Sequence, residues 1–152
     1  EGSVFYLAKT SPIQFRTQAL AKLAFNAIFT VGAILFTTVV CLIATNLPVW
    51  VVLVSSLTAI ILSLGHICHS FDMDLQNPVL DWYDNSEIST IGKSTTKSMI
   101  YALVFGFAMC LVVTLLGTLG IFVALGISVV YLVSRMHLLD VRIDYYYDKM
   151  EI

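Results

Sequence analysis

Residues 23–71 read LAFNAIFTVGAILFTTVVCLIATNLPVWVVLVSSLTAIILSLGHICHSF and contain no Asp, Glu, Lys or Arg. A second window, residues 98–134, also contains none of these four residue types. The hydrocarbon core of a bilayer takes about 20 apolar residues per helix, so each window suits two membrane spans better than one. Turn-forming residues lie near the middle of each window, at Asn46-Leu47-Pro48 and at Gly117-Thr118-Leu119-Gly120. The sequence therefore predicts an all-α membrane protein with four transmembrane helices, arranged as two hairpins.

The composition agrees with one membrane-embedded domain, because only 12% of the residues are charged, against about 25% in soluble domains. The predicted parts are, in chain order, a cytoplasmic segment with an interfacial helix at 1–22, spans at 23–45 and 48–69, a cytoplasmic loop at 70–97, spans at 98–116 and 120–134, and a cytoplasmic tail at 135–152. Because the chain opens with Glu1 and lacks a basic leader, we expect a processed chain or a fragment of a longer polypeptide.

The positions of the basic residues predict the orientation in the membrane. All of them lie in the N-terminal segment, the long loop or the C-terminal tail: Lys9, Arg16, Lys22, Lys93, Lys97, Arg135, Arg142 and Lys149. Four spans place these three regions on one side of the membrane and both uncharged turns on the other. Since Lys and Arg are enriched on the cytoplasmic side, we expect a multi-pass protein of the cell membrane with both termini in the cytoplasm.

The segment before the first span has the features of an amphipathic helix. Ser11 is a suitable N-cap and Pro12 suits the first helical position. Apolar and polar residues then alternate up to Lys22. We therefore expect an N-terminal amphipathic elbow along the membrane surface before span one begins at Leu23. The tail after Arg135 is expected to continue as a second interfacial helix.

Small residues in the spans predict places where helices approach closely. They are Ala102, Gly106, Ala108, Gly117, Gly120, Ala124 and Gly126. The three cysteines, Cys41, Cys68 and Cys110, lack the spacing of an extracellular disulfide framework and are interpreted as buried apolar thiols.

One cluster of metal-ligating residue types lies at the cytoplasmic end of span two. His66, His69 and Asp72 are at i, i+3 and i+6 of a helix, and imidazole with carboxylate can hold a divalent metal. The alternative is that both histidines bond water, lipid headgroups and loop carbonyls at a helix C-terminus, where positive character is favoured. A metal site here would indicate a membrane enzyme.

A carboxylate stripe follows in the tail. Asp140, Asp144 and Asp148 recur every four residues, which places them on one face of a helix. This face either docks a basic partner or is a solvated face opposite Leu139 and Ile143, and the second interpretation is favoured.

The chain contains no phosphate-binding loop, nucleophile elbow or dinucleotide-binding glycine pattern. It also has no acidic or basic residue inside a predicted span, whereas proton-coupled transporters usually need one at membrane depth. The strongest polar side chain inside a span is Asn26. These features argue against an enzyme and against a self-sufficient proton antiporter, and they imply no cofactor.

Two segments resemble permeases of bacterial ATP-binding-cassette exporters. Residues 4–13, VFYLAKTSPI, followed by ALAK at 19–22, are similar to the segment that enters a transmembrane half in that family. Residues 74–82, DLQNPVLDW, are similar to the D-L-x-x-P-x-L-x-W pattern found two spans later. This chain departs from the family pattern at two places. It has Gln76-Asn77 where the family often has a basic residue, and Ser11 where the family usually has Leu.

The resemblance implies the C-terminal transmembrane portion of a longer permease, without ATPase activity of its own. Its partners would be a separate ATP-binding subunit, the remaining permease spans and the lipid bilayer. A homo-oligomer is also possible under this resemblance, and no nucleic-acid partner is expected. The residues it implies for coupling to the ATPase are Pro12, Arg16, Lys22, Asp74, Pro78 and Trp82. The alternative function is a four-helix membrane scaffold or accessory subunit of a larger complex.

Overall fold

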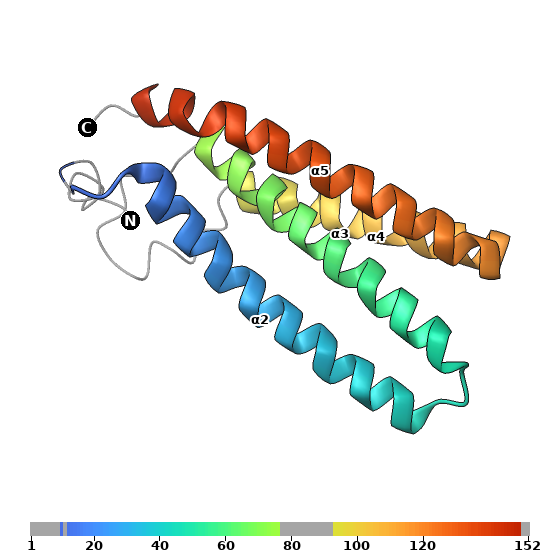
Figure 1. Ribbon diagram of the computed structural model, residues 1–152. Helices are drawn as coiled ribbons and strands as arrows, with labels where there is room; N and C mark the ends of the chain where they lie inside the picture. Colours follow the sequence, from blue (N-terminus) through green and yellow to red (C-terminus); the bar gives the residue numbers. More distant parts are fainter. Residues whose placement is uncertain (1–9, 11, 77–92, 150–152) are drawn as a thin grey trace.

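The described part of the chain is a bundle of long helices. The computed structural model describes Thr10, residues 12–76 and residues 93–149. The helices are α2 (Phe15–Ala44), α3 (Val49–Gln76), α4 (Lys93–Leu116) and α5 (Thr118–Lys149) (Figure 1). Each contains an apolar stretch long enough to cross a membrane. The prediction of an all-α membrane protein with four spanning helices in two hairpins is confirmed.

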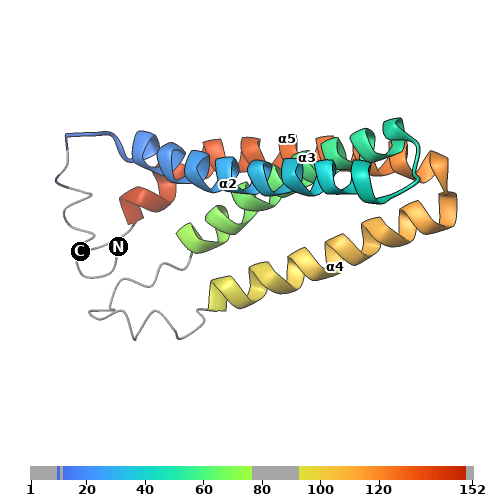
Figure 2. The same ribbon diagram turned by 90° about the horizontal axis from the view of Figure 1, so that it is seen from below.

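Helix α3 lies at the centre of this arrangement. It packs most extensively on α5 and also contacts α2 and α4. Figure 2 shows α4 to one side of the layer that α2, α3 and α5 form. Consequently α2 and α4 both pack against α3 but not extensively against each other. The start of α2, the end of α3, the start of α4 and the end of α5 lie at the same end of the bundle (Figure 1).

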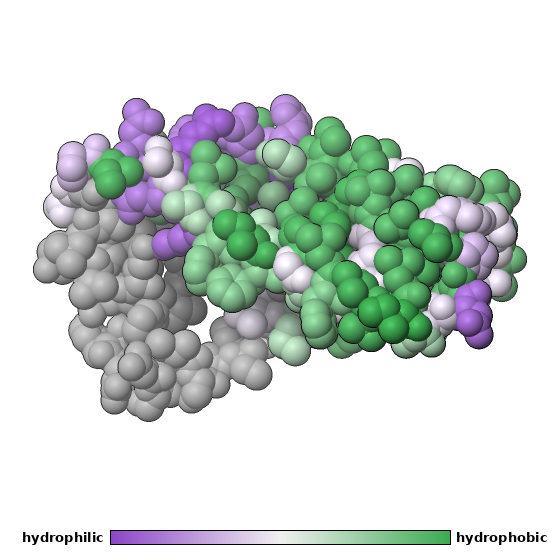
Figure 3. All heavy atoms as spheres, turned by 60° about the horizontal axis from the view of Figure 1, so that its bottom comes forward, coloured by the Kyte–Doolittle hydropathy of each residue, from purple (hydrophilic) through white to green (hydrophobic). Residues whose placement is uncertain are grey.

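Most apolar side chains face outward. Ile28, Phe36, Ile43 and Leu115 are each more than 70% exposed, which in a water-soluble protein would leave the largest residues unprotected. Figure 3 shows apolar side chains over most of the coloured part of one face, whereas hydrophilic ones gather mainly at the end where α2 begins and α5 ends. This pattern is that of a bundle whose outer surface meets lipid, with backbone groups bonded inside each helix.

The two hairpin turns differ in construction. Between α2 and α3, Thr45 N–H donates to the Cys41 carbonyl and Val51 N–H to that of Pro48. Between α4 and α5 the turn is Gly117 alone, with φ of +56°, a conformation that glycine adopts without steric cost. The turn therefore lies within the predicted stretch 117–120 but is shorter, and the predicted start of the fourth span at Gly120 is wrong as a helix boundary because α5 already begins at Thr118.

Gly120 and Gly65 are the points of closest helix approach. A Cβ on Gly120 would lie 2.5 Å from the Val112 carbonyl oxygen of α4. A Cβ on Gly65 of α3 would lie 2.7 Å from the Tyr131 ring of α5. The small-residue prediction holds for Gly120 and for the buried Ala124. The prediction of close helix approach is wrong for four other residues. Gly106 and Gly126 have open space where a Cβ would lie, and Ala102 and Ala108 are exposed.

Several predicted boundaries are also wrong, because the helices are longer than the charge-free windows. Helix α2 begins at Phe15, three residues after the predicted start at Pro12. Its N-cap residue is Gln14, which makes no capping hydrogen bond with its side chain, and the predicted N-cap Ser11 lies outside the described residues. Helix α3 continues to Gln76 and α4 begins at Lys93, so the ends of the predicted 70–97 loop are helical. The predicted elbow and the C-terminal helix are continuous with α2 and α5, and their position at the membrane surface stays a prediction.

Tertiary packing explains these extensions. The buried apolar cluster consists of Ala19, Leu75, Leu139 and Ile143, with Phe15, Leu23, Cys68 and Phe71 packed against it. Most of these residues lie outside the predicted spans. Burial between α2, α3 and α5 stabilises the helical turns that carry them, even where charged residues interrupt the hydrophobic pattern.

The cysteines are free thiols. Cys41 and Cys68 are partly buried, but Cys110 is exposed on the outer surface of α4, so its predicted burial is wrong.

Candidate functional site

The three residues predicted as a possible metal site face three different partners. His66 Nε2 lies 3.2 Å from the Ser98 hydroxyl of α4. The His69 ring meets Tyr101 of α4 edge-on, with ring centroids 5.4 Å apart. Asp72 Oδ2 accepts a hydrogen bond from Arg142 of α5 at 3.3 Å.

Helix geometry explains this divergence. With 3.6 residues per turn, positions i and i+6 point about 120° apart, so His66 and Asp72 cannot converge on one ion. Among the residues that the structure describes, no three His, Cys, Asp or Glu side chains form a group that could hold a metal. The three residues do not form the proposed triad, although each is part of a contact between helices.

These contacts form a polar junction toward the end of the bundle where α3 ends and α4 begins. It consists of His66, His69, Asp72, Ser98, Tyr101, Tyr131 and Arg142. Asp72 is only 3% exposed, and its Oδ2 also accepts a bond from Gln76 Nε2 at 3.1 Å. His69 Nδ1 and Asp72 Oδ1 are buried without a hydrogen-bond partner among the described residues. The junction joins α3 to α4 and to α5.

Aromatic contacts extend the junction along α5. The Tyr131 ring lies 6.4 Å from that of His69 and 4.8 Å from that of Phe105, measured between centroids. The Arg135 guanidinium lies 5.4 Å from the Tyr131 ring centroid, within cation–π range. The junction offers hydrogen bonds, charge compensation and one hydroxyl–imidazole contact, between Ser98 and His66.

Sequence reasoning missed the partners on α4 and α5: Ser98, Tyr101, Tyr131 and Arg142. Arg142 was noted only as one of the basic residues of the C-terminal tail. The others carry no pattern that distinguishes them from ordinary residues of an apolar span.

The residues implied for ATPase coupling lie at the same end but in two places. Arg16, exposed on the first turn of α2, forms an ion pair with Asp140 of α5. Asp74, exposed near the end of α3, instead lines a cleft together with Ser94 and Thr95 of the first turn of α4. Pro12 and Lys22 are exposed, whereas Pro78 and Trp82 lie outside the described residues.

The carboxylate stripe matches the favoured interpretation where its side chains are described. Asp140 and Asp144 are exposed, while Leu139 and Ile143 are 6% and 3% exposed. Asp140 binds Arg16 of the same chain rather than presenting a free carboxylate. The Asp148 side chain lies outside the described part.

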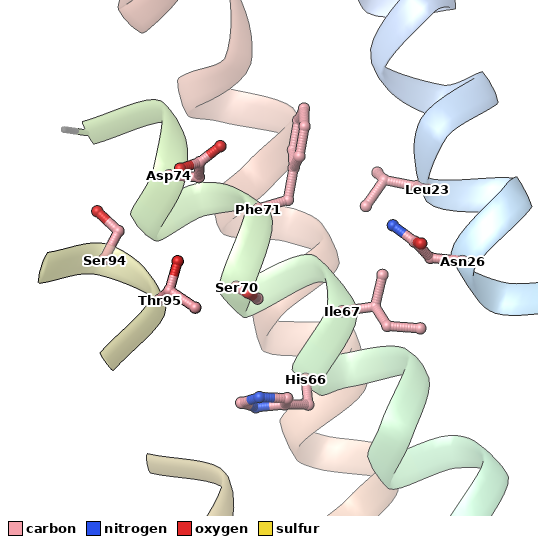
Figure 4. Close-up of a pocket in the computed structure, with 9 residues that line it drawn as sticks. All are labelled: Leu23, Asn26, His66, Ile67, Ser70, Phe71, Asp74, Ser94 and Thr95. Carbon is pink, nitrogen blue, oxygen red and sulfur yellow. The ribbon is translucent and has the colours of Figure 1, made fainter. Parts of the chain in front are cut away.

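A cleft of about 380 Å³ opens beside the junction, between α2, α3 and α4. Figure 4 shows Asn26 of α2 facing Ile67 of α3 across it, with Asp74 near Ser94 and Thr95 of α4. The Ser94 hydroxyl donates to the Met73 carbonyl at 3.3 Å, which fixes the start of α4 next to the end of α3. Asn26, singled out by its position in span one, lines this cleft.

No family model, curated protein or solved structure matches this chain.

Proposed function

We propose that this chain is a membrane-spanning permease segment of an ATP-driven exporter in the cell membrane, with both termini cytoplasmic and no ATPase activity of its own. The observation that supports this most directly is the position of the two exporter-like segments. The first leads into the start of α2 and the second begins at the end of α3, so one helical hairpin returns the chain to the same end of the bundle. A single cytoplasmic ATPase subunit would then meet both.

In this proposal, helix α2 transmits the motion of the ATPase. It is continuous from Phe15 to Ala44, about 45 Å at 1.5 Å per residue, so a push on its first turn tilts the whole helix. Helix α3 contacts all the other helices and passes the displacement to α4 and α5.

The test is coupled ATPase activity. Lys22→Glu should weaken co-purification of the ATP-binding subunit and reduce substrate-stimulated hydrolysis. Arg16→Glu should do the same, but it also places a carboxylate beside Asp140. The double variant Arg16→Glu/Asp140→Arg restores that ion pair and serves as its control. Coupling that stays low in the double variant indicates that Arg16 contacts the ATPase, and full rescue indicates a structural role.

Orientation is tested separately by cysteine labelling. In a variant with Cys41, Cys68 and Cys110 replaced by Ala, a cysteine at Asn46 should react with an impermeant maleimide from outside the cell. A cysteine at Asp144 should react only after the membrane is opened. The reverse pattern contradicts the proposed topology.

A membrane scaffold or accessory subunit is the second candidate. The observation that favours it is the extent of apolar surface on α2 and α4, which suits lateral packing against other membrane helices. A stable native complex that contains no ATPase supports this function over the first.

A further inference from the structure

Helix α3 carries a polar stripe that does not face α5. Ser63, His66, Ser70 and Asp74 follow one another at intervals of three or four residues, which keeps them on one face. The face that meets α5 is marked instead by Gly65 and Asp72. The stripe faces the space between α2 and α4, which do not pack extensively on each other.

This stripe lines two adjoining cavities. The first is the cleft of about 380 Å³ described above, and the second, of about 290 Å³, lies deeper in the bundle. His66 and Ile67 line both, so the cavities adjoin at these two residues, and we refer to them together as the groove. Its combined size is in the range of small-molecule sites, about 300–1,000 Å³.

Polarity changes along the groove. The outer cavity, near the end of α3 and the start of α4, is lined by Asn26, Ser70, Asp74, Ser94 and Thr95 among others. The deeper cavity has mostly apolar walls, including Leu62, Ala102, Phe105 and Gly106. This gradient runs in the same direction as that of a bilayer, from polar surface to hydrocarbon interior. It suits an amphipathic molecule whose head stays at the surface and whose chain points inward.

The charge of the groove specifies the head group. Asp74 is the only formally charged side chain that lines either cavity in the described part of the chain. Ser94 and Thr95 of the first turn of α4 line the cavity beside it, and the positive charge of Lys22 on α2 also acts on it. Polar groups at membrane depth are costly unless they face protein, water or a ligand. A cationic hydrogen-bond donor would complement both the carboxylate and the neighbouring amide and hydroxyl oxygens.

We propose that this groove binds a single-chain amphipathic amine. Its ammonium group lies at Asp74, within reach of Asn26 and Ser70, and its alkyl chain runs past Ile67 toward Phe105 and Gly106. The His66–Ser98 contact holds α4 against α3 where the two cavities join. This site does not depend on the proposed function, because the groove is formed by this chain alone.

The experiment uses the purified chain in phosphatidylcholine nanodiscs and a dodecylamine probe with a terminal diazirine. After photolysis, cross-links should concentrate on α3 and α4 residues of the groove and be displaced by excess dodecylamine. Asp74→Asn should weaken binding about fivefold, the effect expected of a partly exposed ion pair. Its matched control, Asp144→Asn, removes an exposed carboxylate outside the groove and should leave binding unchanged.

A second pair of variants tests the deeper cavity. Neither Gly106 nor Gly126 has an atom within 4 Å of a Cβ, so both accept a larger side chain. Gly106→Leu fills the groove and should abolish cross-linking there, whereas Gly126→Leu, outside it, should not.

Unchanged binding in either Asp74→Asn or Gly106→Leu overturns the proposal. Equal cross-linking by a dodecyl sulfate probe, or displacement by phosphatidylethanolamine as effective as by dodecylamine, overturns it as well.

Discussion

The two ends of the bundle are held together by different forces. At the end where α2 begins and α5 ends, a buried cluster is formed by Ala19, Leu75, Leu139 and Ile143, and two ion pairs join α5 to α2 and α3. At the opposite end, Gly120 brings the backbones of α4 and α5 together, and the Trp50 and Phe122 rings stack with centroids 6.2 Å apart. Neither of these contacts involves a charged residue.

The difference reflects the solvent at each depth. Burial of apolar side chains is driven by water, so it stabilises a cluster that lies among charged residues at the bundle end. Within hydrocarbon, lipid tails solvate Leu or Phe as well as protein does, and association depends on close packing and hydrogen bonds between helices. The predictions below test this contrast, beginning with the largest expected effect.

Arg142→Ala should lower the stability of the protein more than any other substitution proposed below, because it acts at the end that holds the ion pairs. It leaves the carboxylate of Asp72, which is 3% exposed, without its cationic partner. Breaking a fully buried pair costs about 3–5 kcal/mol, and because the Arg142 side chain is 39% exposed we expect a loss at the lower end of that range. Equilibrium unfolding in detergent measures the effect. The double variant Arg142→Gln/Asp72→Asn removes both charges and should recover part of the loss; equal losses in the single and double variants would contradict the role of the ion pair.

Gly120→Ala should weaken the turn end. The added Cβ would lie 2.5 Å from the Val112 carbonyl oxygen and 2.8 Å from Val113 Cα, so the α4 backbone must move. Overpacking of this kind costs about 1–3 kcal/mol. Gly126→Ala is the control, because open space surrounds that position. Similar stability of the two variants would argue against close backbone packing as the force that joins α4 to α5.

Thr38→Val tests the middle of the bundle. The hydroxyls of Thr38 on α2 and Ser56 on α3 lie 2.6 Å apart, whereas Thr37 bonds only its own helix at the Ala33 carbonyl. A hydrogen bond between membrane helices is worth about 0.6–2 kcal/mol. A double-mutant cycle with Ser56→Ala measures it, and Thr37→Val should change stability less. A coupling energy of zero would mean that the contact is not a stabilising hydrogen bond.

Arg16→Ala should have the smallest effect on stability. The side chains of Arg16 and Asp140 are 49% and 56% exposed, and such a pair contributes about 0.2–1 kcal/mol. The loss should disappear at high salt, which screens exposed charges but not the buried Asp72 carboxylate. A large, salt-independent loss would show that both ion pairs at this end belong to the buried core.

Parts of the candidate site were predictable from sequence and parts were not. His66, His69 and Asp72 were found because they cluster on one helix end, but their partners were not, since Asp72 and Arg142 are separated by 70 residues. Asn26 was found because amides are rare inside spans. Gly65, which meets Tyr131, was not found, because nothing in its neighbourhood along the chain indicates which helix face packs.

The sequence alone determined that the chain forms four apolar helices in two hairpins. Windows without charge exclude water-soluble folds, and their length fixes the number of crossings. Only the tertiary structure decided how far each helix extends, which glycine brings two backbones together and which polar side chains meet. These features depend on the rotation and offset of one helix against another, and such quantities arise from contacts between distant residues.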